Sequence, residues 1–163
     1  MKCRKCDGEM VTAVENYKYD ASGLDNLTLV GIEVRRCQNC GEREALIPRL
    51  DELHRVVEVA LAVKRERLLP QEIRFLRKGL GLSSLEFAKK IGVDPATVSR
   101  WENIESPLAM GKSAERLMRY MVLHDEPVQS YALEDLAVEE PQPKRQPRRL
   151  AITPKGWCQE AVA

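Results

Sequence analysis

Apolar and polar positions alternate in two stretches near the start of the chain, 11–19 and 27–35. Alternation of this kind sends successive side chains to opposite faces of a β-strand. The stretch between them, 20–26, is rich in residues that favour turns. We therefore expect a hairpin or a short meander in this part of the chain.

From residue 50 onward, apolar residues recur at intervals of three and four, which is the spacing of one face of a helix. This pattern predicts an amphipathic helix over 51–67. Between 70 and 124, proline and glycine residues separate shorter helical patterns. The expected helices cover 70–78, 84–91, 95–103 and about 112–123. Four short helices in this stretch predict a compact helical module.

The second of these short helices begins with a capping signal. Ser83 followed three residues later by Glu86 forms a capping box, in which each side chain accepts a hydrogen bond from the backbone N–H of the other residue. A helix should therefore begin here. The positions expected to face the core are Leu85, Ala88 and Ile91.

The third short helix has both a defined start and a defined inner face. Gly92 permits a tight turn before it, Asp94 caps it, and Pro95 takes the first position, which needs no amide hydrogen. Val98 and Trp101 lie three residues apart and are expected to pack against the module.

The outer face of this third helix fits the major groove of DNA. Ala96 and Thr97 can approach a thymine methyl group, and Arg100 can pair bidentately with guanine O6 and N7. Ser99 and Asn103 lie on the same face. The alternative is that Arg100 and Asn103 are ordinary solvated surface residues.

Four of the chain's cysteines form two Cys-x-x-Cys corners. Zn2+ prefers four tetrahedral thiolate or imidazole ligands, and each corner can bring two sulfurs to one ion. Such a site is closed, so the expected metal is structural and supplies folding free energy that so small a unit lacks. A redox dithiol pair and an iron site of rubredoxin geometry are the alternatives. The predicted zinc ligands are Cys3, Cys6, Cys37 and Cys40.

Composition argues against several other classes. The formal net charge is +1 and aromatic residues make up 5% of the chain, so we expect neither a polycation nor an aromatic platform for single strands. No apolar run approaches the roughly 20 residues that cross a bilayer, and no leader pattern is seen, so we expect a cytoplasmic protein. His54 and His124 fall in separate helices. We therefore expect no enzyme activity, and we assign Cys158 no role.

These patterns divide the chain into four parts. A four-cysteine zinc-binding domain is expected over 1–47, a helical connector over 48–68 and a helical DNA-binding domain over 69–124. Residues 125–163 are acidic, then basic and proline-rich, and a flexible tail is expected there. The predicted fold class is mainly α with a small zinc-bound β element.

Residues 92–102 resemble the turn and recognition helix of the Xre/Cro-type helix-turn-helix repressors. The order of the chain, with Cys-x-x-Cys corners before that helix, resembles the MqsA (YgiT) type of zinc-finger antitoxins. The resemblance covers about 1–124. It implies a dimer that represses its own operon at a palindromic operator in double-stranded DNA, while the zinc domain binds a cognate toxin, frequently a ribonuclease.

Some positions depart from that family pattern. Ser84 stands where many relatives have a glutamine, and Pro95 and Ala96 stand where many have polar base readers. These three positions join the candidate DNA contacts, but the relatives' operator sequence does not carry over. An alternative function is a zinc-containing helix-turn-helix regulator without a toxin partner.

Pairing of two modules is also expected on physical grounds. One module offers few contacts, and a two-fold dimer doubles them across half-sites about 34 Å apart. The apolar face of the last helix is one candidate for the dimer contact, and the alternative is that it covers the core of its own module. This face carries Leu117, Met118, Met121 and Val122.

Overall fold

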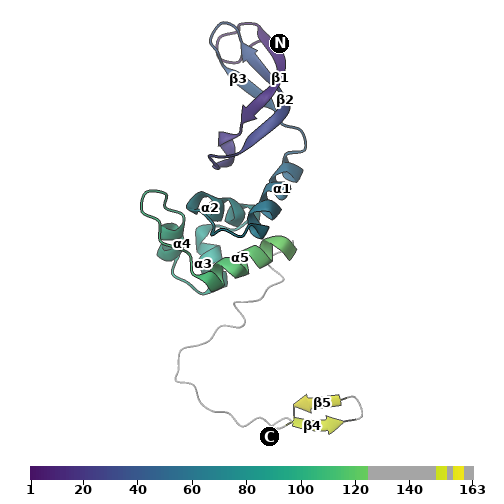
Figure 1. The fold of residues 1–163 in the computed structure, drawn as a ribbon, viewed down its shortest axis with the longest axis vertical. Coiled ribbons are helices and arrows are strands. Elements are labelled where there is room, and N and C mark those ends of the chain that lie inside the picture. Colours follow the sequence, from purple (N-terminus) through teal and green to yellow (C-terminus); the bar gives the residue numbers. More distant parts are fainter. Residues whose placement is uncertain (125–149, 154–155, 160–163) are drawn as a thin grey trace.

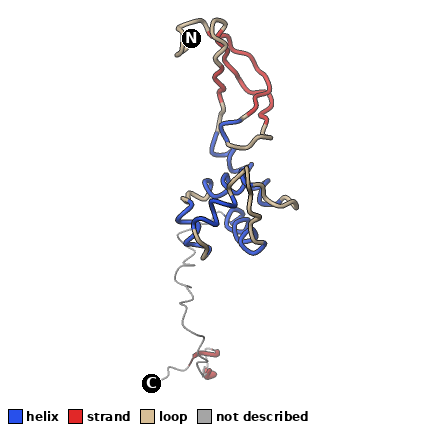
Figure 2. The backbone as a smooth tube through the Cα atoms, turned by 90° about the vertical axis from the view of Figure 1, so that its left-hand side faces the viewer, coloured by secondary structure: helices blue, strands red, loops and turns tan. Residues whose placement is uncertain are grey.

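The computed structural model describes residues 1–124, 150–153 and 156–159 (Figure 1). A small three-stranded sheet lies at the amino-terminal end and a module of helices follows it. Figure 2 shows the same two units from the side, with the sheet extending away from the helices. The predicted fold class, mainly α with a small β element that carries the four cysteines, is confirmed.

The sheet is antiparallel, with strand order β1-β2-β3. Strands β1 (Met10–Lys18) and β2 (Thr28–Cys37) form the hairpin that the alternation predicts, and the short 3-10 helix η1 (Asp20–Ser22) lies in the loop between them. Strand β3 (Arg43–Leu46) pairs with the second half of β2 and was not predicted. Its four residues are too few to show an alternating pattern.

The sheet has little apolar core of its own. In β2 the buried residues are Leu29, Val34 and Cys37, and Cys3 is buried before β1. Val30, by contrast, is 77% exposed. A unit with so few buried apolar side chains needs another source of stability, and a metal ion bound by the cysteines would provide one.

The helices lie close to their predicted ranges. They are α1 (Leu50–Val63), α2 (Pro70–Gly79), α3 (Ser84–Ile91), α4 (Pro95–Trp101) and α5 (Lys112–His124). The largest difference is that α1 ends at Val63, before the predicted residue 67. Its last carbonyls are satisfied from another helix, because Arg119 of α5 donates to the carbonyl oxygens of Leu61 and Ala62 at 3.5 and 3.1 Å.

One buried cluster holds the helical module together. It includes Phe75 and Leu76 from α2, Phe87 from α3 and, as predicted, Val98 and Trp101 from α4. Each helix contributes one apolar stripe to this shared core, as the 3.6-residue period requires.

One predicted inward position is wrong. On α3, Ala88 is buried and Ile91 is half-buried as expected, but Leu85 is 52% exposed. Phe87 fills the core instead and is fully buried. The inner stripe of α3 therefore runs through 87, 88 and 91, and Leu85 lies at the edge of this stripe, exposed to solvent.

The apolar face of α5 covers the core of its own module. Met118, Met121 and Val122 are all buried, and Leu117 is half-buried. Of the two expectations for this face, the structure supports the second. The three buried side chains are therefore not available to a second copy of the chain.

Most of the predicted tail lies outside the described residues. Its described part is a hairpin of β4 (Leu150–Thr153) and β5 (Gly156–Gln159), which no sequence pattern predicted. Cys158 falls in β5, and its predicted lack of a role remains untested. In the described ranges, no helix has both the length and the apolar character needed to cross a bilayer.

Candidate metal centre and nucleic-acid interface

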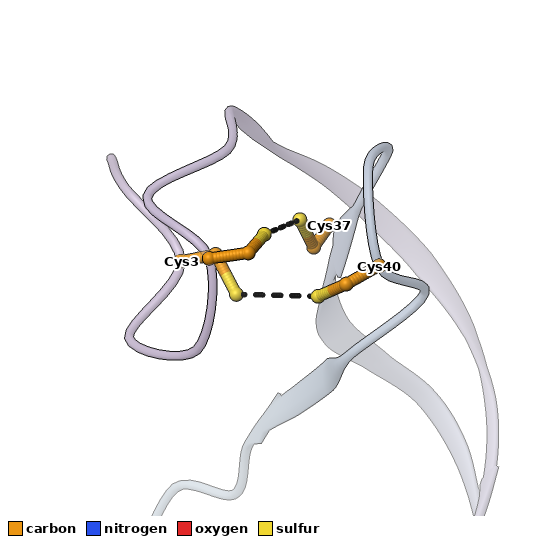
Figure 3. Close-up of side chains that lie close together, drawn as sticks. Cys3, Cys37 and Cys40 are labelled. Carbon is orange, nitrogen blue, oxygen red and sulfur yellow. Dashed lines mark hydrogen bonds between the residues drawn. The ribbon is translucent and has the colours of Figure 1, made fainter.

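The four predicted zinc ligands come together at one end of the sheet (Figure 3). Cys3 and Cys6 precede β1, Cys37 ends β2, and Cys40 lies in the turn before β3. Their Sγ atoms all lie within 4.8 Å of one another. Across the two corners, the Sγ atom of Cys6 lies 3.4 Å from that of Cys37, and the Sγ atom of Cys3 lies 3.7 Å from that of Cys40.

This geometry fits a tetrahedral metal ion. With Zn–S bonds of about 2.3 Å, neighbouring sulfurs of a tetrahedral site lie about 3.8 Å apart. The observed distances are close to that value and well above the length of a disulfide bond, about 2.05 Å. Four cysteine ligands leave no open coordination position, so the site suits a structural ion, and zinc matches its donor set.

The two corners turn in different ways. In the second corner Gly41 has a positive φ of 74°, a conformation that glycine adopts without strain, and its N–H donates to the carbonyl of Cys37 at 3.0 Å. In the first corner the positive φ belongs to Asp7, at 55°. Gly8 is needed for space instead, because a Cβ there would lie 3.1 Å from the Sγ of Cys37 and 3.2 Å from the Sγ of Cys6.

The pKa values of Cys37 and Cys40 are shifted in opposite directions. Hydrogen bonding from the backbone of Cys40, and then of Asn39, outweighs burial and lowers the pKa of Cys37 to about 6. The backbone of Glu42 acts to lower the pKa of Cys40, but the neighbouring Cys6, burial and the other thiols together raise it to about 12. Negatively charged sulfurs this close repel one another, and a cation among them would offset that repulsion.

Helix α4, the expected recognition helix, begins as predicted. The Oδ1 atom of Asp94 accepts a hydrogen bond from the N–H of Ala96 at 2.7 Å, and Pro95 occupies the first position. Gly92, with a φ of 70°, ends α3 and turns the chain toward α4. These local contacts explain why α3 and α4 form as separate helices joined by a short turn.

A buried ion pair fixes the other end of α4, and sequence reasoning missed it. The Arg77 guanidinium of α2 donates to both carboxylate oxygens of Glu102, the residue after α4, at 2.6 and 2.9 Å. Arg77 also donates to the carbonyl of Leu82 at 2.6 Å. These hydrogen bonds with Glu102 raise the pKa of Arg77, against the effect of burial. The pair orients α4 relative to α2 and α3.

The predicted DNA-contacting residues gather around the outer surface of α4. Pro95, Ala96, Ser99, Arg100 and Asn103 are exposed, whereas Ser84 and Thr97 are half-buried. The guanidinium of Arg100 has no hydrogen bond or ion pair with any residue in the described ranges. It is therefore free to pair with a base or a phosphate.

Two of these residues already have partners within the protein. The Ser99 hydroxyl donates to the carbonyl of Pro95 at 3.3 Å. The Oδ1 atom of Asn103 accepts from the backbone N–H groups of Glu105 and Ser106 at 2.9 and 3.2 Å. Asn103 thus orders the loop that follows α4 and keeps only its amide nitrogen for another partner.

Comparison with known proteins identifies the helical module. A family model described as helix-turn-helix matches residues 73–107, which include most of α2 and all of α3 and α4. No curated protein and no solved structure matches the chain. The match indicates a DNA-binding transcription regulator, and the cysteine cluster adds a site suited to zinc.

Proposed function

We propose that this protein is the antitoxin of a type II toxin-antitoxin pair. In this proposal the helical DNA-binding domain, residues 69–124, binds a palindromic operator and represses the chain's own operon. The four-cysteine domain, residues 1–47, is held by a structural zinc ion and binds the toxin. The helix-turn-helix match and the cysteine cluster support the underlying regulator role.

The free guanidinium of Arg100 is the observation that carries the DNA-binding part. Arg100 lies on α4, whose orientation is fixed by buried Trp101 on one side and by the Arg77 to Glu102 pair at its end. A rigid helix that presents an unpaired arginine matches the way helix-turn-helix proteins read guanine in the major groove. Ala96 and Thr97 would then approach neighbouring bases.

Exposed apolar side chains on the sheet support a protein partner for the zinc-binding domain. Val11 and Val14 of β1 and Val30 of β2 are all exposed. Exposed apolar side chains on so small a unit are available to a protein partner. A toxin, of the ribonuclease class that the family resemblance suggests, is the partner we propose.

A dimer follows from the DNA-binding role. One helix-turn-helix module makes too few contacts with DNA for tight specific binding, and a dimer of two modules doubles those contacts. Because the apolar face of α5 is used inside the module, the dimer contact must use other residues. The exposed Ile104 and Leu108, in the loop after α4, are our candidates for it.

The alternative is a zinc-containing helix-turn-helix regulator without a toxin partner. The family match covers residues 73–107 and therefore says nothing about what the cysteine domain binds. This observation supports the second candidate function. Both candidates predict DNA binding, so only the partner distinguishes them.

An electrophoretic shift of the chain's own upstream DNA, with and without the product of the neighbouring gene, tests the proposal. We expect the chain alone to shift this DNA. We also expect the neighbouring product to be toxic when expressed alone and to bind the cysteine domain. A neighbouring product that is harmless and does not bind would favour the regulator without a toxin.

A further inference from the structure

The loop at the far end of the β1–β2 hairpin reaches into the helical module. Leu24 in this loop is 3% exposed and belongs to the same buried cluster as Phe75 and Leu76 of α2. Leu27 packs against that cluster as well. Figure 1 shows this end of the hairpin facing α1 and α2. The helical core is therefore completed by a residue from the other unit.

Three rings extend the contact across the junction. Tyr19, directly after β1, is buried, and its hydroxyl lies 3.1 Å from Nε2 of His54 on α1. The two rings stack with their centroids 6.0 Å apart, and His54 meets Phe75 of α2 edge to face at 5.7 Å. At the rim, Gln71 of α2 donates to Asp25 at 3.4 Å. Apolar burial, ring contacts and hydrogen bonds thus join the two units.

The hairpin itself holds this loop in shape. The N–H of Tyr19 donates to the carbonyl of Leu27 at 2.9 Å. The Ser22 hydroxyl donates to the carbonyl of Tyr19 at 2.7 Å and accepts from the N–H of Leu24 at 3.1 Å. Leu24 can therefore occupy the helical core without reordering the loop.

The cysteine cluster holds the opposite end of the same hairpin. The β1–β2 register runs from Met10 opposite Cys37 to Lys18 opposite Thr28, next to the loop. Because the sheet has few buried apolar residues, loss of the metal should loosen the pairing from the cysteine end. The loop that carries Leu24 would then lose its support.

We propose that the loop of residues 19–27 couples the metal centre to the DNA-binding module, so that loss of the metal destabilises the helix-turn-helix itself. The sheet and the helical module then unfold as one cooperative unit when the metal is lost. A chain deprived of zinc loses operator affinity although no zinc ligand lies in the helical module. This coupling is separate from toxin binding and holds for either function considered above.

Thermal unfolding of the full-length chain, followed by the fluorescence of Trp101, tests the coupling. Trp101 is buried in the helical core, and replacing the second tryptophan (Trp157→Phe) makes it the sole reporter. Removing zinc with a chelator should lower the Tm reported by Trp101 by at least about 5 °C. An unchanged Tm after complete zinc removal would overturn the proposal.

Leu24→Ala should weaken the coupling, and Val30→Ala is its control because Val30 lies on the same hairpin but is exposed. Chelation should lower the Tm of the Val30→Ala chain as it does in the unmodified sequence. In Leu24→Ala the drop should be less than half as large. Equal drops in the two variants would contradict the role of the loop.

If Leu24→Ala does not fold, a second pair of variants with smaller changes tests the same coupling. Tyr19→Phe removes only the hydroxyl beside His54, and Tyr17→Phe makes the same change on β1 away from that contact. The drop in Tm on zinc removal should be smaller in Tyr19→Phe than in the unmodified chain. In Tyr17→Phe this drop should be unchanged. Because these measurements use no DNA and no toxin, their failure would leave the proposed function standing.

Discussion

At the scale of single residues, the two cysteine corners form their turns with different residues: Asp7 and Gly8 in the first corner, and Gly41 in the second. Gly41 supplies the left-handed turn of the second cysteine corner. In the first corner Asp7 takes the left-handed conformation, which costs an L-residue about 1–2 kcal/mol. Gly8 leaves room for the sulfurs of Cys6 and Cys37. The two corners therefore tolerate different substitutions.

Gly8→Ala should weaken zinc binding by about 10- to 100-fold, the range seen when residues that orient metal ligands are changed. The added Cβ would lie 2.9 Å from the Cβ of Asn39 and press on two ligand sulfurs. Competition with a chelator measures the affinity. Gly111→Ala is the control, since nothing lies within 4 Å of its new Cβ. Equal affinities in the two variants would contradict the close approach.

The roles of single residues could be predicted from the sequence where a fixed spacing goes with one kind of chemistry. The four ligands follow from the Cys-x-x-Cys spacing, and the caps Ser83 and Asp94 follow from capping rules. The exposure of Leu85 did not follow, because a short helix with several apolar residues allows more than one inner stripe. The left-handed conformation of Asp7 did not follow from the sequence either, because glycine, and not aspartate, is the usual residue for that conformation.

At the scale of elements, the position of α4 depends on the buried pair of Arg77 and Glu102. Glu102→Gln should destabilise the fold by roughly 3–5 kcal/mol, because Arg77 would stay buried without its counter-charge. Urea unfolding measures this loss. Glu105→Gln, in the exposed loop nearby, should change stability little. Replacing both partners, as in Arg77→Met with Glu102→Leu, should recover much of the loss.

A second buried carboxylate should make stability depend on pH. Burial acts to raise the pKa of Glu115, but hydrogen bonds from Arg119, the Leu68 N–H and Arg67 outweigh it and lower the pKa. The stabilisation is therefore present above the unfolded-state pKa, about 4.3, and is lost as pH falls through the folded-state pKa.

Glu115→Gln should lower the free energy of unfolding near neutral pH. Below about pH 5, this variant should lose less stability on acidification than the unmodified chain does. Urea unfolding at several pH values measures both effects. Glu66→Gln is the control, since Glu66 is exposed. If Glu115→Gln lost as much stability on acidification as the unmodified chain, the assignment would be wrong.

The helices were predictable because proline, glycine and capping residues mark their ends. The two ion-pair clusters were not, because their members are far apart in the chain. Arg67 lies 48 residues from Glu115, and Arg77 lies 25 from Glu102. Strand β3 was missed because its pairing with β2 depends on the cysteine turn that precedes it.

At the scale of the whole molecule, the four-cysteine site should hold one metal ion per chain. Elemental analysis of the purified protein should find one zinc per chain. Cys40→Ser should lose most of this zinc and destabilise the sheet, because a structural zinc contributes on the order of 10 kcal/mol to folding. Cys158→Ser, outside the cluster, should keep it. Equal zinc contents in the two variants would rule out the four-cysteine site.

The sequence predicted two kinds of structure in the right order, a cysteine-bound β element followed by a helical module. It did not predict that they share a core through Leu24. Local patterns report which face of an element is apolar, but not which distant element will cover it. The domain boundaries 1–47, 48–68 and 69–124 therefore remain predictions.

The most direct test of the central claim is the affinity of Arg100→Ala for the chain's own upstream DNA. Loss of one arginine to guanine contact should cost roughly 1–3 kcal/mol, a weakening of about 5-fold or more, with thermal stability unchanged. Arg65→Ala, which removes another exposed arginine, should bind nearly as well as the unmodified chain. If folded Arg100→Ala binds as tightly as Arg65→Ala, then α4 does not read DNA in the way described.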